Sequence, residues 1–363
     1  MATAAPAHVP RRIPSLPVPE APPPPKHPRD HAIVVGIQHY LPGIPSLRGS
    51  INDCRLFCQW LAAPEGGGLD PRNITFYASQ DPTDECPFGN QIANLILALQ
   101  QRAWGEGTPL GRRLYLFFSG HGVAAPNQSN DCGLVMANAM PAAIRAFVGG
   151  KVAADLRRSG WFEEIVLVMD CCREVAGNVI DESVLPSFSD AAAGEKPFFH
   201  ILAAGWGSTT SEKELPHPLD PSQGDLHQGV LTHALLKALQ LARDPAGNVS
   251  AESLQRFIPP LVGKLTGDSS KEPWIEFPPA LPPIIFGQSR GLEFTLTLLP
   301  GTAGFRLRGT NYADITAEGI RNGDTFTFWL APGLHLIERL DANGAAVGDE
   351  IRNILQGGEH VSL

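Results

Sequence analysis

Two side chains that could form a thiol–imidazole pair, His121 and Cys172, each lie three residues beyond an apolar run, RLYLFF and IVLVM respectively. In open parallel sheets, reactive groups collect beyond the carboxyl ends of the strands, where the loops converge. A free thiol is only a few per cent ionised at neutral pH, so a neighbouring imidazole turns it into a useful nucleophile. We therefore expect His121 to act as base and Cys172 as nucleophile. The backbone N–H groups of Gly122 and Cys172 are expected to form an oxyanion hole.

The elements that must position these residues lie between residues 31 and 287, where apolar runs alternate with segments of helical periodicity. Strands are predicted at 32–37, 74–78, 113–118, 165–169 and 198–203, and helices at 52–61, 91–102, 229–241 and 251–258. Continuous apolar strands separated by helices indicate a parallel sheet with helices on both faces. The pattern predicts an α/β fold.

Proline marks the edges of this α/β segment. Ten of the 34 prolines fall in the first 30 residues and seven more between Pro259 and Pro283. Residues 1–30 are expected to form a disordered, extended Pro-rich arm. Residues 272–287 read as an irregular strap that closes the domain 31–287. After it the apolar pattern alternates with period two and includes Asn-Gly turns, which predicts a small antiparallel β-sandwich over 288–363.

Charge and composition exclude several classes of function. The net charge of the 363 residues is −9 and no Lys/Arg cluster exceeds a pair, which argues against nucleic acid or an anionic membrane as a partner. Neither a signal peptide nor an apolar segment long enough to span a membrane is found. The six cysteines form no disulfide framework. We expect a cytoplasmic protein with reduced thiols.

The residues around His121 and Cys172 resemble the caspase/metacaspase superfamily. SGHG follows one strand and Asp-Cys-Cys the next, and His121 precedes Cys172 by 51 residues, where caspases have about 50. SLRGSINDCRLF (46–57) is similar to the family's Gly-x-x-Asn-Asp helix start, HILAAGWGSTTSEKE (200–214) to the strand and loop after the nucleophile, and GVLTHALLKAL (229–239) to the helix that follows. The resemblance covers about residues 31–287 and implies a caspase-like fold.

The resemblance assigns a role to each matching residue. Cys172 takes the place of the nucleophile, two positions after Asp170, and Cys171 takes the place of a serine, although Cys171 is the alternative nucleophile. Asp53 and Asp170 match the acids that line the specificity pocket of metacaspase-like members, and two carboxylates favour a Lys or Arg side chain there. The implied function is that of a cysteine endopeptidase cleaving protein substrates after a basic residue.

Other interpretations stay open. Arg173 follows the nucleophile as in true caspases, and together with Arg48 near Asp53 it leaves a preference for acidic residues as an alternative. Asp53 could instead cap its own helix. A non-catalytic scaffold, in which the sandwich and the arm recruit partners, is the alternative from another class.

The resemblance also bears on cofactors and regulation. The stretch after His121 offers only Asp131 as a hard-cation ligand, so neither calcium nor another metal is expected. Loops 175–197 and 205–228 are expected to be cut or reordered on activation, with Lys213 preferred over Lys196 as the self-processing point. By analogy alone, the family suggests an upstream activating protease or regulator and a role in prokaryotic defence or cell death.

Overall fold

A computed structural model of the chain describes residues 24–79, 89–124, 131–183, 196–268, 271–279, 281–310, 312–355 and 357–363. A six-stranded sheet forms its centre, in the order β13-β9-β7-β3-β1-β2. Its strands are β1 (His31–Ile37), β2 (Ile74–Ser79), β3 (Gly111–Ser119), β7 (Phe162–Asp170), β9 (Phe198–Leu202) and β13 (Trp274–Glu276). All neighbours run parallel except β13, which is antiparallel to β9. The predicted parallel sheet is confirmed, with an antiparallel edge strand added.

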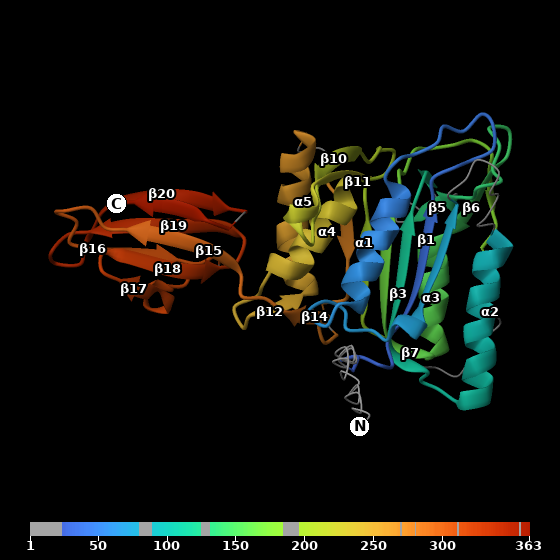
Figure 1. Cartoon of the computed structure of the whole chain (residues 1–363), viewed down its shortest axis with the longest axis horizontal. Helices are drawn as coiled ribbons and strands as arrows, with labels where there is room; N and C mark the ends of the chain where they lie inside the picture. The colour runs from blue at the N-terminus through green and yellow to red at the C-terminus, as the bar shows by residue number, and fades with distance from the viewer. Residues whose placement is uncertain are drawn as a thin grey trace, which may run out of the picture.

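Helices cover both faces of the sheet (Figure 1). Helices α1 (Ser50–Ala62), α4 (Val230–Leu241) and α5 (Ala251–Thr266) share one apolar core with alternate residues of the strands, such as Val34 and Phe117. Helices α2 (Gly89–Glu106) and α3 (Gly149–Ser159) share a second core with the residues in between, such as Val35 and Phe118. Because successive strand residues face opposite sides, strands buried on both faces need the unbroken apolar runs seen in the sequence.

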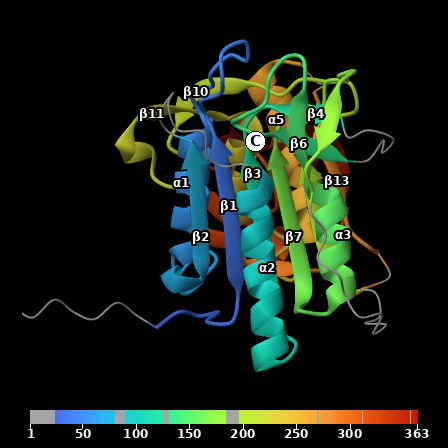
Figure 2. The same ribbon diagram turned by 90° about the vertical axis from the view of Figure 1, so that its right-hand side faces the viewer.

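Short strands gather beyond the carboxyl ends of the central strands. A second sheet contains β4 (Gly122–Ala124), β5 (Cys132–Val135), β6 (Ile144–Val148) and β8 (Val179–Asp181). A hairpin of β10 (Glu212–Pro216) and β11 (Asp225–Gly229) lies beside α1 and contains a short 3₁₀ turn, η2 (Pro221–Gln223). Figure 2 shows β4, β6, β10 and β11 at the same end of the molecule. Loop 205–228, which we expected to be cut or reordered on activation, is largely built into this hairpin. Most of loop 175–197 lies outside the described residues.

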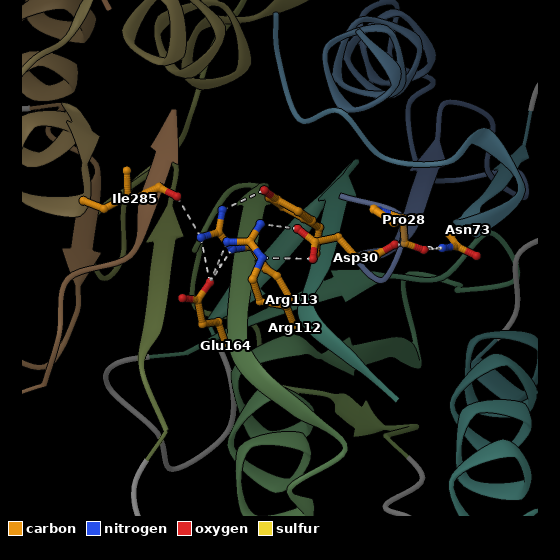
Figure 3. A network of polar contacts seen from close by, with 8 residues as sticks. Pro28, Asp30, Asn73, Arg112, Arg113, Glu164 and Ile285 are labelled. Atoms are coloured by element: carbon orange, nitrogen blue, oxygen red, sulfur yellow. Dashed lines mark hydrogen bonds and ion pairs between the residues drawn. The ribbon is translucent and has the colours of Figure 1, made fainter. Parts of the chain in front are cut away.

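The opposite end of the sheet is held by a buried arginine, Arg113, whose side chain is 1% exposed (Figure 3). Its guanidinium donates hydrogen bonds to Glu164 (2.6 Å), to Tyr115 Oη (2.9 Å) and to the carbonyl of Ile285 (2.9 Å). Strands β3 and β7 are thus tied to β14 (Ile285–Gln288), which pairs with β12 (Asn248–Ser250).

The N-terminal segment joins the same end of the sheet. Asp30 is 1% exposed and pairs with Arg112, while the Asn73 amide, in the 3₁₀ turn η1 (Pro71–Asn73), donates to the carbonyls of Pro28 (2.8 Å) and Asp30 (3.1 Å) (Figure 3). Ordered structure therefore begins before residue 31, where the sequence pattern placed the domain edge. Residues 1–23 of the predicted arm lie outside the described residues.

The C-terminal part of the chain forms two small sheets around a core of its own (Figure 1). One contains β15 (Leu292–Thr297), β17 (Ile320–Asn322), β18 (Thr325–Leu330) and β21 (Glu359–Ser362), and the other β16 (Gly304–Arg308), β19 (Gly333–Leu340) and β20 (Ala346–Ile354). A 3₁₀ turn, η3 (Thr316–Glu318), follows β16. The predicted sandwich is present, although β21 pairs parallel to β15. The guanidinium of Arg243 links it to the body by donating to the carbonyls of Arg290 and Trp329.

Helix α5 and residues 272–287 differ from the sequence prediction. Helix α5 continues to Thr266 through the half-buried Pro259 and the exposed Pro260, because Ile258, Leu261 and Val262 on either side of them are buried in the core. The expected irregular strap supplies β13 and β14. Among the described helices, none is long and apolar enough to cross a membrane.

Candidate active site

The strand register brings His121 and Cys172 to one edge of the central sheet. Ser119 and Asp170 end the neighbouring strands β3 and β7 and pair directly with each other. His121 and Cys172 each follow two residues later, so the two loops leave the sheet side by side. Both side chains are partly exposed. The structure thus places the two predicted residues on adjacent loops, as the parallel strand ends require.

Gly122 packs directly against the backbone of Cys172. A Cβ atom at Gly122 would lie 2.2 Å from the Cys172 carbonyl oxygen, 3.0 Å from the Cys172 nitrogen and 2.5 Å from Cys171 Cβ. Beyond this contact, Ala124 N–H donates to the carbonyl of Glu174 (2.9 Å) and continues the pairing of the two loops. Only glycine fits at position 122, and it keeps the two backbone segments that carry the predicted oxyanion donors side by side.

Two atoms of the loop after β1 hold His121. Its Nε2 lies 2.8 Å from the carbonyl oxygen of Pro45, and its backbone N–H donates to Tyr40 Oη (2.8 Å). A carbonyl can only accept, so Nε2 carries the hydrogen in this contact and Nδ1 is the basic nitrogen of the neutral ring. The contact with Pro45 therefore selects the tautomer.

The Cys172 thiol accepts a hydrogen bond from the backbone N–H of Thr210 (3.3 Å), and its own backbone carbonyl accepts one from the Cys132 thiol (3.3 Å). Burial raises the pKa of Cys172, and the Thr210 N–H opposes that rise. The thiol is therefore protonated at neutral pH in this resting state and needs a base. Cys171 is 0% exposed, which leaves it without access to a substrate, and burial raises its pKa well above the usual range.

Asp53 and Asp170 lie close together but are buried, with exposed fractions of 1% and 4%. Asp53 accepts from Ser119 Oγ (2.8 Å) and from Gly229 N–H (2.8 Å), and Asp170 accepts from the N–H (2.9 Å) and Oγ1 (2.6 Å) of Thr232. Both carboxyl groups thereby hold the first turn of α4, an arrangement that the helix dipole favours. Asp53 makes no cap to its own helix, α1, which has no side-chain cap.

Burial is the first cause of raised pKa values in this acid pair. It raises the pKa of Asp170 to about 6, and burial followed by the charge of Asp170 raises that of Asp53 well above its usual range. A third acid, Glu212 on β10, raises both pKa values further. Its carboxylate accepts from the N–H groups of Arg48 (3.0 Å) and Gly49 (2.9 Å), at the start of α1. Three acids therefore converge beside the sheet edge that carries Cys172.

Two further residues that the sequence indicated as candidates, Arg173 and Asp131, are held by contacts within the protein. Arg173 is 1% exposed, donates to the Ala204 carbonyl (3.2 Å) and lies over the Trp206 ring at 5.7 Å. Asp131 is buried and accepts from the N–H groups of Gly150 (2.9 Å) and Lys151 (2.8 Å), so it caps α3. Residues 125–130, which complete the stretch after His121, lie outside the described residues.

Sequence reasoning missed four contributors to this site, namely Tyr40, Pro45, Thr210 and Glu212. Pro45 and Thr210 contribute backbone atoms, and residue type does not show which backbone atoms will contact the site. Glu212 is separated from Asp53 by more than 150 residues, and only the hairpin fold brings it back to α1. It lies in the polar segment STTSEKE (208–214), where an acid is too common to single out.

Comparisons with known proteins place this geometry in a family. Residues 29–276 match the family profile described as Caspase domain. A curated relative from a Desulfuromonadales bacterium, named as a probable protease, is 23% identical over 149 residues, which cover 40% of this chain and 18% of the relative. The matched part is thus less than a fifth of that protein. Caspase-1 from Spodoptera frugiperda is a structural neighbour with 13% identity and a TM-score of 0.43, covering 77% of this chain and 98% of its own.

Proposed function

Since the chain belongs to the caspase family of cysteine peptidases, we propose that Cys172 and His121 are its nucleophile and general base. The observation that carries the proposal is the pairing of Ser119 with Asp170, from which both residues extend onto adjacent loops. The packing of Gly122 on Cys172 and the tautomer selected by Pro45 support it. Burial of Cys171 favours Cys172 as the reactive thiol.

The proposed reaction runs in two steps. Nδ1 of His121 takes the thiol proton as the Cys172 sulfur attacks the peptide carbonyl, and the N–H groups of Gly122 and Cys172 stabilise the oxyanion. The imidazolium returns the proton to the leaving amine, and a thioester on Cys172 remains. A water molecule, deprotonated by His121, then attacks the thioester and releases the carboxylic acid product with the free thiol.

We propose that the enzyme prefers Arg or Lys before the scissile bond. Asp53, Asp170 and Glu212 converge near the nucleophile, and a guanidinium or ammonium group entering this desolvated cluster would favour the ionised form of the acids and pair with it. The basic side chain would replace the N–H donors of Gly229 and Thr232 as partner of the acids, which requires the β11–α4 turn to shift. Arg48, exposed beside this cluster, is the group that would serve an acidic side chain instead.

The test uses the full chain on a panel of fluorogenic peptides identical except for Arg, Lys or Asp before the bond. We expect cleavage after Arg and Lys, loss of at least about a thousandfold in Cys172→Ala and His121→Ala, and retained activity in Cys171→Ala. Cleavage that survives in Cys172→Ala would overturn the nucleophile, and cleavage only after Asp would overturn the specificity. Parallel reactions with calcium and with a chelator test the expectation that no metal is required.

An inactive zymogen is separated from a scaffold by chemical labelling of Cys172. The rate of alkylation by iodoacetamide needs no peptide pocket, so a His121-dependent rate reports the assembled pair in an uncleaved chain. If wild type and His121→Ala react equally fast and no peptide is cut, the non-catalytic scaffold replaces the peptidase.

Regulation and partners follow as further parts of the proposal. We propose protein substrates, an upstream regulator or protease, and a role in defence or cell death that rests on the family analogy alone. For self-processing, Lys213 remains the candidate, but its ammonium donates to the Leu265 carbonyl (2.7 Å) at the end of α5. Cutting there therefore requires the hairpin to leave α5. A cut product that persists in Lys213→Ala would move the site elsewhere.

A further inference from the structure

Tyr40 lies beneath the loop that carries His121 and has not been part of the proposed chemistry. It is 7% exposed, and its ring centre lies 5.0 Å from that of the His121 imidazole, tilted by 52°. Its hydroxyl accepts the hydrogen bond from His121 N–H (2.8 Å) and donates to the carbonyl of Ile37 (3.2 Å) at the end of β1. One side chain thus links the backbone of His121 to the central sheet.

The neighbours of Tyr40 leave its hydroxyl little room to move away from His121. A Cβ atom at Gly120 would lie 2.8 Å from the Tyr40 hydroxyl, so the residue before His121 runs closely past it. Leu41 N–H donates to the Ala137 carbonyl (3.2 Å), which fixes the residue after Tyr40 against the turn that follows β5.

The same loop holds the imidazole at a second point. It runs from Tyr40 to Pro45 and returns to the residue after β1, where Leu47 N–H donates to the Gln38 carbonyl (2.9 Å). Pro45 then receives the Nε2 hydrogen of His121. One loop therefore holds His121 through two hydrogen bonds, one from its backbone to Tyr40 and one from its ring to Pro45. Burial raises the pKa of the Tyr40 hydroxyl well above its usual range, so the hydroxyl stays neutral and keeps the hydrogen that it donates to Ile37.

We propose that Tyr40 is a positioning residue for His121: its hydroxyl fixes the backbone of the base so that the ring can reach both Pro45 and the thiol. The inference rests on the proposed function of His121. Removing the hydroxyl leaves the His121 N–H without its acceptor and lets the base move relative to Cys172. Small misplacements of catalytic groups can slow a reaction by up to about a hundredfold. The Tyr40 hydroxyl bonds the backbone of His121 and neither nitrogen of its ring, so its proposed role is to position the base.

The test compares Tyr40→Phe with Tyr77→Phe, which removes the same atom from a half-buried tyrosine of β2. Peptide cleavage and the rate of Cys172 alkylation by iodoacetamide are measured in the full chain. We expect Tyr40→Phe to lower kcat and the alkylation rate about tenfold with KM changed less than about twofold, and Tyr77→Phe to change neither. In a His121→Ala background, Tyr40→Phe should have no further effect on alkylation, because it acts through the imidazole.

Several outcomes decide against Tyr40. Equal alkylation of wild type and Tyr40→Phe, or an additive loss in the double variant, would overturn the positioning role and leave the Cys172–His121 pair intact. If His121→Ala itself does not slow alkylation, the proposed function fails instead. Should thermal unfolding show that Tyr40→Phe does not fold, Gly120→Ala is the second variant, because its Cβ would lie 2.8 Å from the hydroxyl and 2.9 Å from the movable end of the Leu134 side chain. It must then give the same alkylation defect in folded protein, and wild-type rates there would refute the proposal.

Discussion

Ser119 and Asp170 form the last paired position of β3 and β7, and each takes part in a hydrogen bond that involves a carboxyl group of the candidate site. The Ser119 hydroxyl donates to Asp53, and Asp170 accepts from Thr232 of α4. One strand pair therefore fixes the origins of the His121 and Cys172 loops and also holds the acid pair beneath α4. The catalytic loops and the proposed specificity site are both held by this strand pair, so a substitution in either one is expected to alter the other.

Gly122→Ala is expected to abolish peptide cleavage. The added Cβ would lie 2.2 Å from the Cys172 carbonyl oxygen, which is backbone and cannot turn aside, so the two loops must separate. The control is Gly177→Ala, where a Cβ meets nothing within 4 Å. We expect a loss of at least about a hundredfold in kcat/KM for Gly122→Ala and no change for Gly177→Ala, with thermal unfolding measured on both. Full activity in Gly122→Ala would show that the close approach is not needed for catalysis.

Asp170→Asn is expected to reduce the dependence of stability on pH, with the buried acids Asp53 and Asp131, whose pKa values are also raised, still titrating in the variant. Burial raises the pKa of Asp170 to about 6 in the folded protein, above its value of 3.8 in the unfolded chain, so the folded state favours the protonated acid. This contribution is complete below about pH 4 and is lost as the pH rises through about 6. A shift of this size corresponds to roughly 3 kcal/mol.

The measurement is urea unfolding of wild type and Asp170→Asn between pH 4 and pH 7, with Asp225→Asn on the exposed start of β11 as control. Wild type and the control should lose stability across this range relative to Asp170→Asn. Parallel curves for all three proteins would mean that Asp170 has the same proton affinity in the folded and unfolded chain.

Sequence patterns predicted the central sheet because strands buried on both faces must be continuously apolar, as in HAIVVGI of β1. They also predicted which strand ends carry His121 and Cys172. Helix α3 was missed because it opens with two glycines, which usually disfavour helices. The structure explains the first of them: a Cβ at Gly149 would lie 2.4 Å from the Met169 sulfur. The continuation of α5 was missed because prolines usually end helices, whereas core packing prevails here.

The site was only partly predictable for a related reason. Side chains that carry chemistry could be recognised by type, but the contact between Pro45 and His121 uses a backbone carbonyl, and any residue type supplies one. Burial of Asp53 and Asp170 beneath the β11–α4 turn depends on tertiary packing that no local pattern records. Their role in specificity therefore stays a prediction.

Arg113 lies far from the candidate active site, and Arg113→Met is expected to destabilise the whole domain. The substitution removes the donor to Ile285 and leaves Glu164 with only the longer contact to Arg112 (3.7 Å), at about 1–3 kcal/mol for buried acceptors that lose their donor. The control is Arg102→Met on α2, where an exposed pair with Glu106 contributes less than about 0.5 kcal/mol. Urea unfolding gives both values. A cost for Arg113→Met as small as that for Arg102→Met would show that the network in Figure 3 is not a major stabiliser.

Glu212→Gln separates a structural role of the third acid from a role in specificity. The amide has the shape of the carboxylate and keeps one acceptor for the N–H groups of Arg48 and Gly49, but it removes the charge. If the acids bind a basic side chain, kcat/KM for the Arg peptide should fall about tenfold while alkylation of Cys172 stays unchanged. Glu214→Gln, two residues along β10 and exposed, is the matched control and should change neither quantity. Equal kcat/KM for wild type and Glu212→Gln would restrict Glu212 to holding the start of α1, and a gain on the Asp peptide would favour Arg48 as the specificity residue.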